Sequence, residues 1–312
     1  MKLSPAVDLY IQRKRDAGMR FDSPTNKLRS FLRHCGDIDL HHITVQQVTA
    51  FLDGSGSMPG GWIGKRGTLR SFFDYWTARG RLKSSPVPTS APKTTQSFVP
   101  YIYSRSDLRS LLDAVPRCQR KSACVMSEAT FRTLLLFLYA TGMRLGEALR
   151  LRLMDVNLTL GLITIRDTKF YKSRLVPLGP DIKGLIQQYL HQPGRRNQHY
   201  HPLFQTKSGH PIAGQVAGTS FSRLRRIARI ERRDDSYFQP RLHDLRHTFA
   251  VHRLTEWYRQ NADVQRLLPA LSTYLGHVDL SATQRYLTMT PELLQQANHR
   301  FERYACGGAD ER

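Results

Sequence analysis

The chain has 312 residues, of which 40% are hydrophobic and 10% aromatic, a composition that excludes an intrinsically disordered chain. Its length accommodates two domains of ordinary size, each with its own core. The formal net charge is +22, from 47 Lys and Arg against 25 Asp and Glu, and both halves of the chain share the excess. Such a charge is typical of proteins that bind a polyanion, most commonly nucleic acid, although a basic surface kept for solubility is the alternative.

Several other classes of protein are disfavoured by local features. The four cysteines are scattered and form no CxxC pair, so neither a zinc knuckle nor a disulfide framework is indicated. The N-terminus MKLSPAVDLY lacks the apolar core of a signal peptide, and the longest apolar run, LLLFLYA at 134–140, is too short to cross a bilayer. We therefore expect a cytoplasmic protein with no membrane association.

The first 82 residues are predicted to form a small bundle of about four helices. Ser4 and Ser23 each precede a proline, a pattern that favours them as N-caps. The apolar residues of TNKLRSFLRHC fall on one helical face, and the aromatic residues further on are expected in the core rather than in base stacking: Phe72, Tyr75 and Trp76.

A segment rich in Pro, Ser and Thr, GRLKSSPVPTSAPKTTQSFVP at 80–100, predicts an extended linker over 83–100. The remainder, 101–312, is predicted to be a mixed domain. SEATFRTLLLFLYATG reads as an apolar helix that ends at Gly142, and the stretch 161–179 reads as two β runs around a short turn. Further helices are expected near 181–190, 214–230, 242–258, 263–275 (ended by Gly276), 281–287 and 291–304.

Six positions in this second part could carry chemistry, although each has an ordinary structural explanation when taken alone. Arg144 lies where one helix ends and the next begins, and Lys169 lies at the tip of the predicted hairpin. His243 and Arg246 share a helical face. His277 follows a helix end, and Tyr286 lies nine residues later. His243 and His247 also have the i, i+4 spacing of metal ligands, but no HExxH pattern or third ligand supports zinc.

Taken together and in this order, these positions resemble the tyrosine recombinases, or phage-type integrases. The similarity rests on ATGMRLGEALRL (140–151), TKFYKSRLVPL (168–178), HDLRHTFA (243–250) and LGHVDLSATQRYL (275–287), and it extends over about 101–304. The resemblance implies a mainly α protein with a small β-sheet and two domains that form a C-shaped clamp. Residues 1–82 would be a helical, SAM-like core-binding domain that binds DNA, and 101–312 the mixed α/β catalytic domain.

The resemblance also implies a role for each matched residue. Tyr286 would be the nucleophile, and His243 and His277 would fill the two histidine positions. The lysine of the hairpin would be Lys169, with Lys172 as a competitor for that role. Arg144 and Arg246 would be the two arginines that hold the scissile phosphate. Glu147 would be the acidic residue that supports the first of them.

These residue types suit phosphodiester cleavage. A tyrosine hydroxyl can form a covalent phosphotyrosine, but its ordinary pKa of about 10 means that a neighbouring group such as His243 must take its proton. Two guanidinium groups match the non-bridging phosphate oxygens, and Lys169 could protonate the departing 5′ oxygen. The covalent 3′-phosphotyrosine keeps the bond energy, so neither a metal, a cofactor nor ATP is expected.

The predicted function is therefore site-specific cleavage and rejoining of double-stranded DNA, in the integration or transposition of a mobile element. The resemblance suggests a homotetramer on paired sites, alone or with a related recombinase, in which helix 291–304 docks on a neighbouring subunit. The alternatives are a recombinase that resolves chromosome dimers, a type IB topoisomerase-like enzyme that relaxes DNA, and a non-catalytic DNA-binding protein on the same scaffold.

Overall fold

The structure is a computed structural model. It describes residues 1–19, 21–54, 59–90, 99–166, 173–234, 236, 238–277, 279–288, 295 and 298. These residues separate into two compact units, one within residues 1–90 and the other within residues 99–288. Both units are mainly helical, and the second contains a small antiparallel sheet, as predicted from the sequence.

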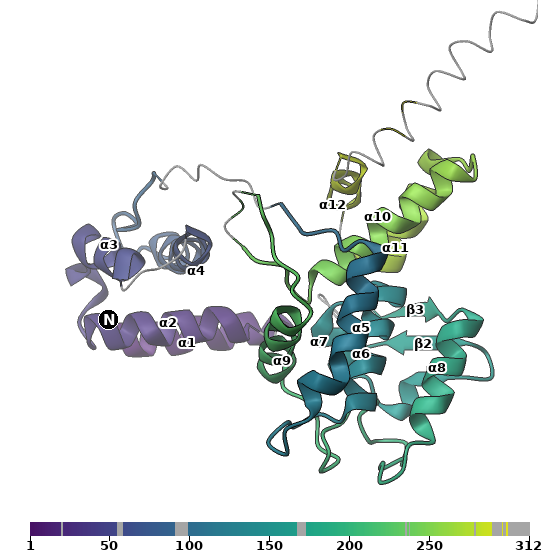
Figure 1. The fold of residues 1–312 in the computed structure, drawn as a ribbon. Helices are drawn as coiled ribbons and strands as arrows, with labels where there is room; N and C mark the ends of the chain where they lie inside the picture. The colour runs from purple at the N-terminus through teal and green to yellow at the C-terminus, as the bar shows by residue number, and fades with distance from the viewer. Residues whose placement is uncertain are drawn as a thin grey trace, which may run out of the picture. The chain divides into compact units, whose positions relative to one another are not determined.

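The first unit is a helical bundle around an aromatic core. Its elements are α1 (Leu3–Asp16), α2 (Asp22–Cys35), η1 (Leu40–His42), α3 (Val45–Asp53) and α4 (Pro59–Thr77) (Figure 1). The predicted core position of Phe72 and Trp76 is confirmed, because both are buried, and Tyr75 packs against them half-buried. The ring of Tyr10 meets Phe72 and Tyr75 edge to face, with centroids 5.4 and 5.0 Å apart.

Two helix starts in this unit differ from the sequence prediction. α1 begins at Leu3 and α2 at Asp22, so Ser4 and Ser23 lie inside the first turns instead of capping them. In α1 the reason is tertiary: the backbone N–H of Ser4 donates to the carboxylate of Asp37 at 2.7 Å, 33 residues away. A distant carboxylate therefore satisfies an N–H group that a local cap would otherwise take.

The start of the proline-rich segment lies against α4. Val87 is buried in the first unit's core, and Nε of Arg66 donates to the carbonyl of Pro88 at 2.9 Å. A second N–H group of Arg66 donates to the carbonyl of Thr89. These bonds attach the segment to the first unit as far as Thr89.

The main core of the second unit lies between helices and one face of the sheet. Its helices are α5 (Arg105–Gln119), α6 (Glu128–Thr141), α7 (Leu145–Arg150), α8 (Pro180–Leu190) and α9 (Gly214–Ile227). α6 is held at its start by Ser127, whose hydroxyl accepts from the N–H of Thr130 at 3.1 Å. It ends at Gly142, which adopts φ +58° as the predicted C-terminal stop requires.

The two predicted β runs form β2 (Leu162–Ile165) and β3 (Arg174–Pro177), which pair antiparallel with Ile165 opposite Arg174 (Figure 1). A third strand, β1 (Val156–Asn157), follows the 3-10 turn η3 (Leu153–Asp155) and pairs with β2. It was not predicted, because two residues are too few to show an alternating pattern.

A second, smaller core forms around α10 (Asp244–Arg259) and α11 (Val264–Leu275). α11 ends at Gly276 with φ +69°, again as predicted. The single predicted helix at 281–287 is α12 (Ser281–Gln284) continued by the 3-10 turn η5 (Arg285–Thr288). The predicted helix 291–304 lies outside the described residues, apart from 295 and 298.

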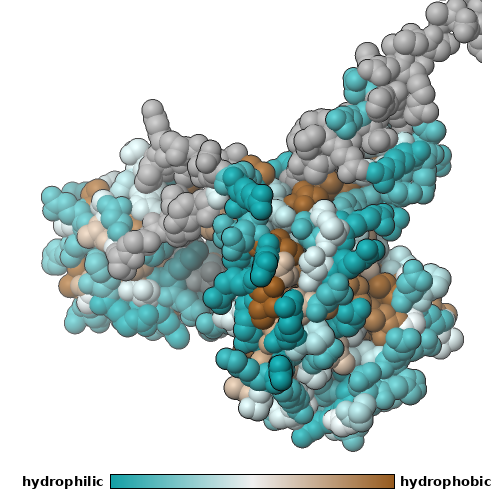
Figure 2. Space-filling view, viewed as in Figure 1, coloured by the Kyte–Doolittle hydropathy of each residue, from teal (hydrophilic) through white to brown (hydrophobic). Residues whose placement is uncertain are grey.

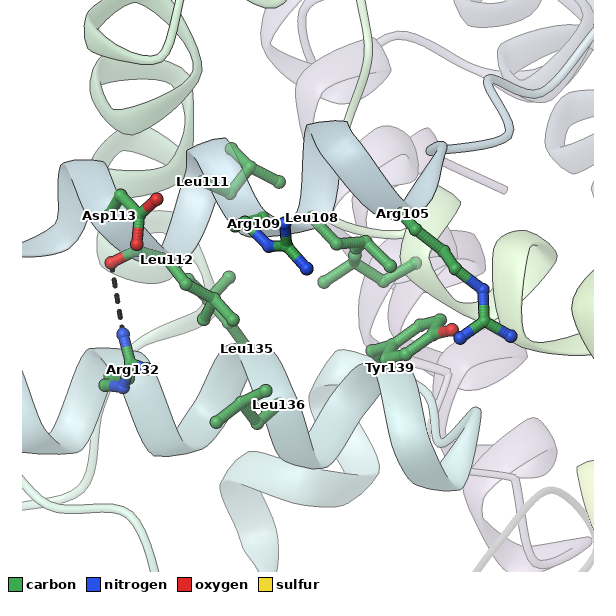
Figure 3. A pocket seen from close by; sticks show the side chains of 11 residues that line it. Arg105, Leu108, Arg109, Leu111, Leu112, Asp113, Arg132, Leu135, Leu136 and Tyr139 are labelled. Atoms are coloured by element: carbon green, nitrogen blue, oxygen red, sulfur yellow. Dashed lines mark hydrogen bonds between the residues drawn. The ribbon is translucent and has the colours of Figure 1, made fainter.

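Figure 2 shows that hydrophilic side chains dominate the visible face and that hydrophobic ones form separate patches. A surface groove of about 390 Å³ lies between α5 and α6, where leucines line it and Arg105, Arg109 and Arg132 stand at its rim (Figure 3). None of the six predicted site residues lines this groove. Among the described residues, no helix has the length and hydropathy needed to span a membrane.

Candidate active site

The structure brings five of the six predicted site residues into one region of the second unit. Arg144 is the N-cap of α7, His243 directly precedes α10, and Arg246 lies in the first turn of α10. His277 follows Gly276 at the end of α11, and Tyr286 lies in η5. The sixth, Lys169, lies outside the described residues, as does Lys172.

Arg144 is held by a carboxylate from its own helix. Its Nη1 donates to Oε1 of Glu147 at 2.9 Å, and its backbone N–H donates to Oε2 of the same residue at 3.2 Å. The Glu147 side chain is 5% exposed, whereas that of Arg144 is 40% exposed. A buried anion thus orients a cation that still reaches the solvent, which is the arrangement an arginine needs to meet an external anion.

Glu147 also accepts from a residue that the sequence analysis missed. Nη2 and Nη1 of Arg174, at the start of β3, donate to Oε2 at 2.7 Å and to Oε1 at 3.2 Å. Burial by itself would raise the pKa of Glu147, but the hydrogen bonds and charges of Arg174 and Arg144 outweigh burial and lower that pKa to about 2. The carboxylate is therefore ionised at any physiological pH.

Arg246 is held by main-chain carbonyls instead. It is 3% exposed, and its Nη1 and Nη2 donate to the carbonyls of Gly142 and Leu275, each at 2.8 Å. Burial and the charge of Arg144 lower the pKa of Arg246 to about 10, so the guanidinium stays charged at neutral pH. Both acceptors lie at helix C-termini, where carbonyls lack a partner within the helix and the helix dipole favours a cation.

The end of α11 gathers three arginines on consecutive carbonyls. The carbonyl of Tyr274 accepts from Nε of Arg174 at 3.1 Å, that of Leu275 accepts from Arg246, and that of Gly276 accepts from Nη2 of Arg144 at 3.0 Å. Gly276 has φ +69°, and a Cβ on it would lie 2.7 Å from Nη1 of Arg174, so a larger residue would strain the backbone and displace this guanidinium. One helix end therefore positions guanidinium groups from α7, α10 and β3.

Tyr286 lies beside two histidines of the site. Its ring centroid is 6.1 Å from that of His277 and 5.6 Å from that of His247. The residue is 2% exposed and packs in the smaller core with residues of α10 and α11. Burial raises the pKa of the phenol, and the positive charges of Arg246 and Arg144 act in the opposite direction. The phenol is accordingly protonated at neutral pH.

His277 is fixed by a buried threonine that the sequence analysis also missed. Its Nδ1 lies 2.7 Å from Oγ1 of Thr283, which is fully buried in α12. Desolvation, followed by the charges of Arg246 and Arg144, lowers the pKa of His277 to about 4. The imidazole is neutral at pH 7, and the bond to Thr283 fixes its orientation.

His243 lies at the surface, yet desolvation and then the charges of Arg246 and Arg241 lower its pKa. It is therefore a neutral base at pH 7. His247, one turn further along α10, has a pKa lowered to about 3, first by desolvation and then by His243. The described residues include no group of three or more His, Cys, Asp or Glu that could hold a metal ion.

The turn that carries His243 is held by a hydrogen-bond network beneath it. The buried carboxylate of Asp244 accepts from the backbone N–H of Arg241 at 2.8 Å, and the hydroxyl of Tyr103 donates to the carbonyl of Arg241 at 2.9 Å. The hydroxyl of Thr248 accepts from the N–H of Tyr103 at 3.0 Å. The extended segment before α5 is thus tied to the start of α10, which fixes the direction of His243 and Arg246.

Sequence alone offered little signal for the two residues that were missed. Arg174 stands within the matched stretch TKFYKSRLVPL, but an arginine at the start of a strand is normally read as exposed. A sharper signal was the alternation of side chains along a strand, because Arg174 lies two residues before Val176 and therefore shares its inward face. Thr283 had no distinguishing pattern.

Comparisons with known proteins identify the family of the chain. The model of the phage integrase family matches residues 104–292, which is more than half of the chain. The integrase/recombinase-type protein y4rB of Sinorhizobium fredii is 36% identical over 307 residues, covering 96% of each chain. Tyrosine recombinase XerC of Staphylococcus saprophyticus is 28% identical over 234 residues, covering 74% of this chain and 72% of the relative.

A solved structure of a lambda integrase tetramer bound to a Holliday junction shares the fold, with a TM-score of 0.63 and 19% identity. The match covers 89% of this chain and 78% of that one. The resemblance inferred from the motifs is thereby confirmed, and so is the expectation of an enzyme. The chain belongs to the phage integrase family of tyrosine recombinases, which are site-specific recombination enzymes.

Proposed function

We propose that this protein cleaves and rejoins double-stranded DNA at specific sites through a covalent 3′-phosphotyrosine at Tyr286. The observation that carries the proposal is the convergence of Arg144, Arg246, His277 and Tyr286 around the end of α11. These groups come from four separate segments of the chain. Two fixed cations beside a tyrosine suit attack on a phosphodiester, in which negative charge develops on the non-bridging oxygens.

In the proposed reaction, the phenol oxygen of Tyr286 forms a bond to phosphorus while the bond from phosphorus to the 5′ oxygen breaks. The phenol is protonated at rest, so it must lose a proton, and His243 is a neutral base suited to accept it. Arg144 and Arg246 stabilise the phosphorane oxygens. We assign protonation of the departing 5′ oxygen to Lys169, with Lys172 as the competing candidate, and a hydrogen bond to the phosphate to His277.

The burial of Tyr286 adds a step to this scheme. A phenol that is 2% exposed cannot meet a duplex phosphate unless the surrounding segment moves. Tyr286 itself lies in η5, a single 3-10 turn after the short helix α12. We therefore infer that DNA binding moves the Tyr286 segment before the first strand is cut. Rejoining reverses the chemistry, as a 5′-hydroxyl attacks the phosphotyrosine and releases the phenol.

We extend the proposal to the domains and partners expected from the sequence. Residues 1–82 would be a core-binding domain for DNA, 83–100 a linker, and 101–312 the catalytic domain with helix 291–304 at its end. A net charge of +22 supports a polyanionic partner. The tetrameric assembly of the structurally similar lambda integrase supports a homotetramer on paired sites. The cytoplasmic location stays a prediction.

The experiment is trapping of the covalent adduct on a nicked suicide substrate that carries the protein's own site. That site is found first, by sequencing DNA that remains covalently attached to the protein after denaturation of cells. Wild type should form the adduct and Tyr286→Phe should not. Tyr274→Phe is the matched control, because Tyr274 packs against the same core and its carbonyl, which contacts the site, is kept in the variant. Equal trapping by wild type and Tyr286→Phe would refute the assignment.

The same sequencing decides between two biological roles. We favour a mobile element, in which case the attached DNA should end at the boundaries of a movable segment. The similarity to XerC supports the alternative of chromosome-dimer resolution, which predicts a single attachment site on the chromosome. Relaxation of supercoiled plasmids without any site preference would instead favour the topoisomerase-like alternative.

A further inference from the structure

The largely buried guanidinium of Arg174 contacts two parts of the candidate site. The Arg174 side chain is 12% exposed and donates to both carboxylate oxygens of Glu147, at 2.7 and 3.2 Å. Its third nitrogen, Nε, donates to the carbonyl of Tyr274 at 3.1 Å. All three nitrogens are therefore used in binding α7 on one side and the end of α11 on the other.

The contact with Glu147 bears directly on Arg144. Glu147 has two tasks in α7: it caps the helix by accepting from the backbone N–H of Arg144, and it orients the guanidinium of Arg144. The cations that face this carboxylate are Arg144 at the start of α7, Arg174 of β3 and Arg246 of α10. Only Arg174 and Arg144 bond to it, and Arg144 is partly exposed. Arg174 is thus the buried counter-charge that keeps Glu147 ionised.

The contact with Tyr274 bears on the other half of the site. The next two carbonyls, of Leu275 and Gly276, accept from Arg246 and Arg144, and His277 comes directly afterwards. The left-handed backbone of Gly276 leaves space that the Arg174 guanidinium occupies, since an added Cβ would lie 2.8 Å from its Cζ. Movement of Arg174 would therefore disturb the chain just before His277.

We propose that Arg174 is a positioning residue for DNA cleavage, which fixes Glu147 and the last turn of α11 so that Arg144 and His277 address the same phosphate. The inference rests on the proposed function, because it concerns the rate at which Tyr286 is joined to DNA. Arg174 itself does not touch the phosphate in this scheme. Arg174 is the first residue of β3, the strand that follows residues 167–172.

The test is the single-turnover rate of covalent trapping, measured from pH 5 to pH 8.5 on the suicide substrate with the full chain. Arg174→Met should lower the rate at pH 8 by about 10- to 100-fold, the effect of misplacing a catalytic group by about an ångström. The variant should also show an additional fall in rate at low pH, an acid limb. Without the counter-charge of Arg174 the pKa of Glu147 rises, so the carboxylate takes up a proton at higher pH. Below the new pKa, the rate should fall by about 10-fold per pH unit.

Three further variants separate positioning from general structural damage. Arg174→Lys keeps the charge, so it should recover the wild-type pH profile while its rate stays below wild type. The double variant Glu147→Gln with Arg174→Met lacks the titrating carboxyl, so the added acid limb should disappear and leave only the wild-type dependence on the protonation of His243. Arg232→Met is the matched control: Arg232 is also buried and bonds a carboxylate, Asp234, and a carbonyl, that of Val99, away from the site. Its rate should match wild type at every pH.

The outcomes are distinguishable from failure of the proposed function. If wild type forms no adduct at any pH, the proposed function fails first. If wild type reacts and Arg174→Met either behaves as Arg232→Met or slows equally at all pH values, the positioning role is wrong. Should Arg174→Met fail to fold, the Lys variant decides alone: a wild-type rate there would show that the bidentate geometry of Arg174 is irrelevant.

Discussion

The first turns of α7 and α10 hold the two arginines of the site in different ways. Arg144 is 40% exposed and is aimed by the carboxylate of Glu147, whereas Arg246 is 3% exposed and is held by the carbonyls of Gly142 and Leu275. The exposed cation is held by an ionisable partner as well as by the carbonyl of Gly276, whereas two carbonyls, which cannot titrate, hold the buried one. The two arginines should therefore respond differently to substitution, to acid and to backbone strain.

Substitution by lysine should lower the cleavage rate much more at Arg246 than at Arg144. Lysine keeps the charge but has no fork, so it can reach only one of two carbonyls that belong to different helices. We expect Arg246→Lys to lower the cleavage rate by about 1,000-fold, equivalent to about 4 kcal/mol in the barrier. Arg144→Lys keeps an ion pair with Glu147 and should lose only about 10- to 100-fold. Single-turnover trapping on the suicide substrate measures both, and equal losses would contradict the distinction.

Acid should weaken the support of Arg144, because its partner Glu147 can be protonated, and should leave the carbonyls that hold Arg246 unchanged. The pKa of Glu147 is about 2 in the folded chain against an ordinary value of 4.5, so its ionised form favours folding. This contribution is fully present above about pH 4.5 and is lost as the pH falls toward 2, with a total of about 3 kcal/mol. Urea unfolding between pH 7 and pH 3 measures it. Glu147→Gln should show a shallower decline, and an identical decline would disprove the linkage.

Backbone strain at Gly142 should affect Arg246, because the carbonyl of Gly142 is one of its two acceptors. Gly142 has φ +58°, and a Cβ there would lie 2.4 Å from Cδ1 of Phe249 and 2.9 Å from Cδ2 of Leu275. Gly142→Ala should lower the free energy of unfolding by about 2–3 kcal/mol, from the left-handed backbone and from overpacking. Gly80, which follows the end of α4 with φ +67° and has no atom within 4 Å, is the control. Gly80→Ala should cost only about 1 kcal/mol, and equal costs would show that the contacts are unimportant.

The smallest effect is expected at Thr283, which supports His277 without touching either arginine. Thr283→Val removes the hydroxyl that lies 2.7 Å from Nδ1 of His277 and should lower stability by about 1 kcal/mol. The trapping rate should fall a few-fold, because the imidazole loses a fixed orientation. Thr255→Val is the control, since the hydroxyl of the buried Thr255 bonds only the carbonyl of Val251. A normal trapping rate in Thr283→Val would remove Thr283 from the site.

The sequence predicted those features that arise from local chemistry. The stops at Gly142 and Gly276 followed from the freedom of glycine at a left-handed helix end, and both were confirmed. The pairing of β2 with β3 followed from two β-rich runs. The link between Arg144 and Glu147 came instead from the resemblance to the tyrosine recombinases, and the structure contains this ion pair.

Features that depend on distant contacts were not predictable in this way. The carboxylate of Asp37 overrode the cap expected at Ser4. The partners of Arg246 are main-chain atoms 29 and 104 residues away, and no side-chain pattern encodes them. Arg174 was overlooked for the same reason, since its role depends on Glu147 and on the carbonyl of Tyr274. The role of Lys169 and the docking of helix 291–304 stay predictions.

The carbonyls of residues 274 to 276 carry a lesson for mutagenesis. Alanine scanning replaces side chains and leaves every peptide oxygen in place, so a scan through Tyr274 and Leu275 would report packing defects and overlook the anchoring of three guanidinium groups. Replacing single peptide bonds by esters weakens the acceptor strength of a chosen carbonyl without altering any side chain. Semisynthesis at this helix end would therefore reveal a layer of the recombination machinery that genetic substitution cannot reach.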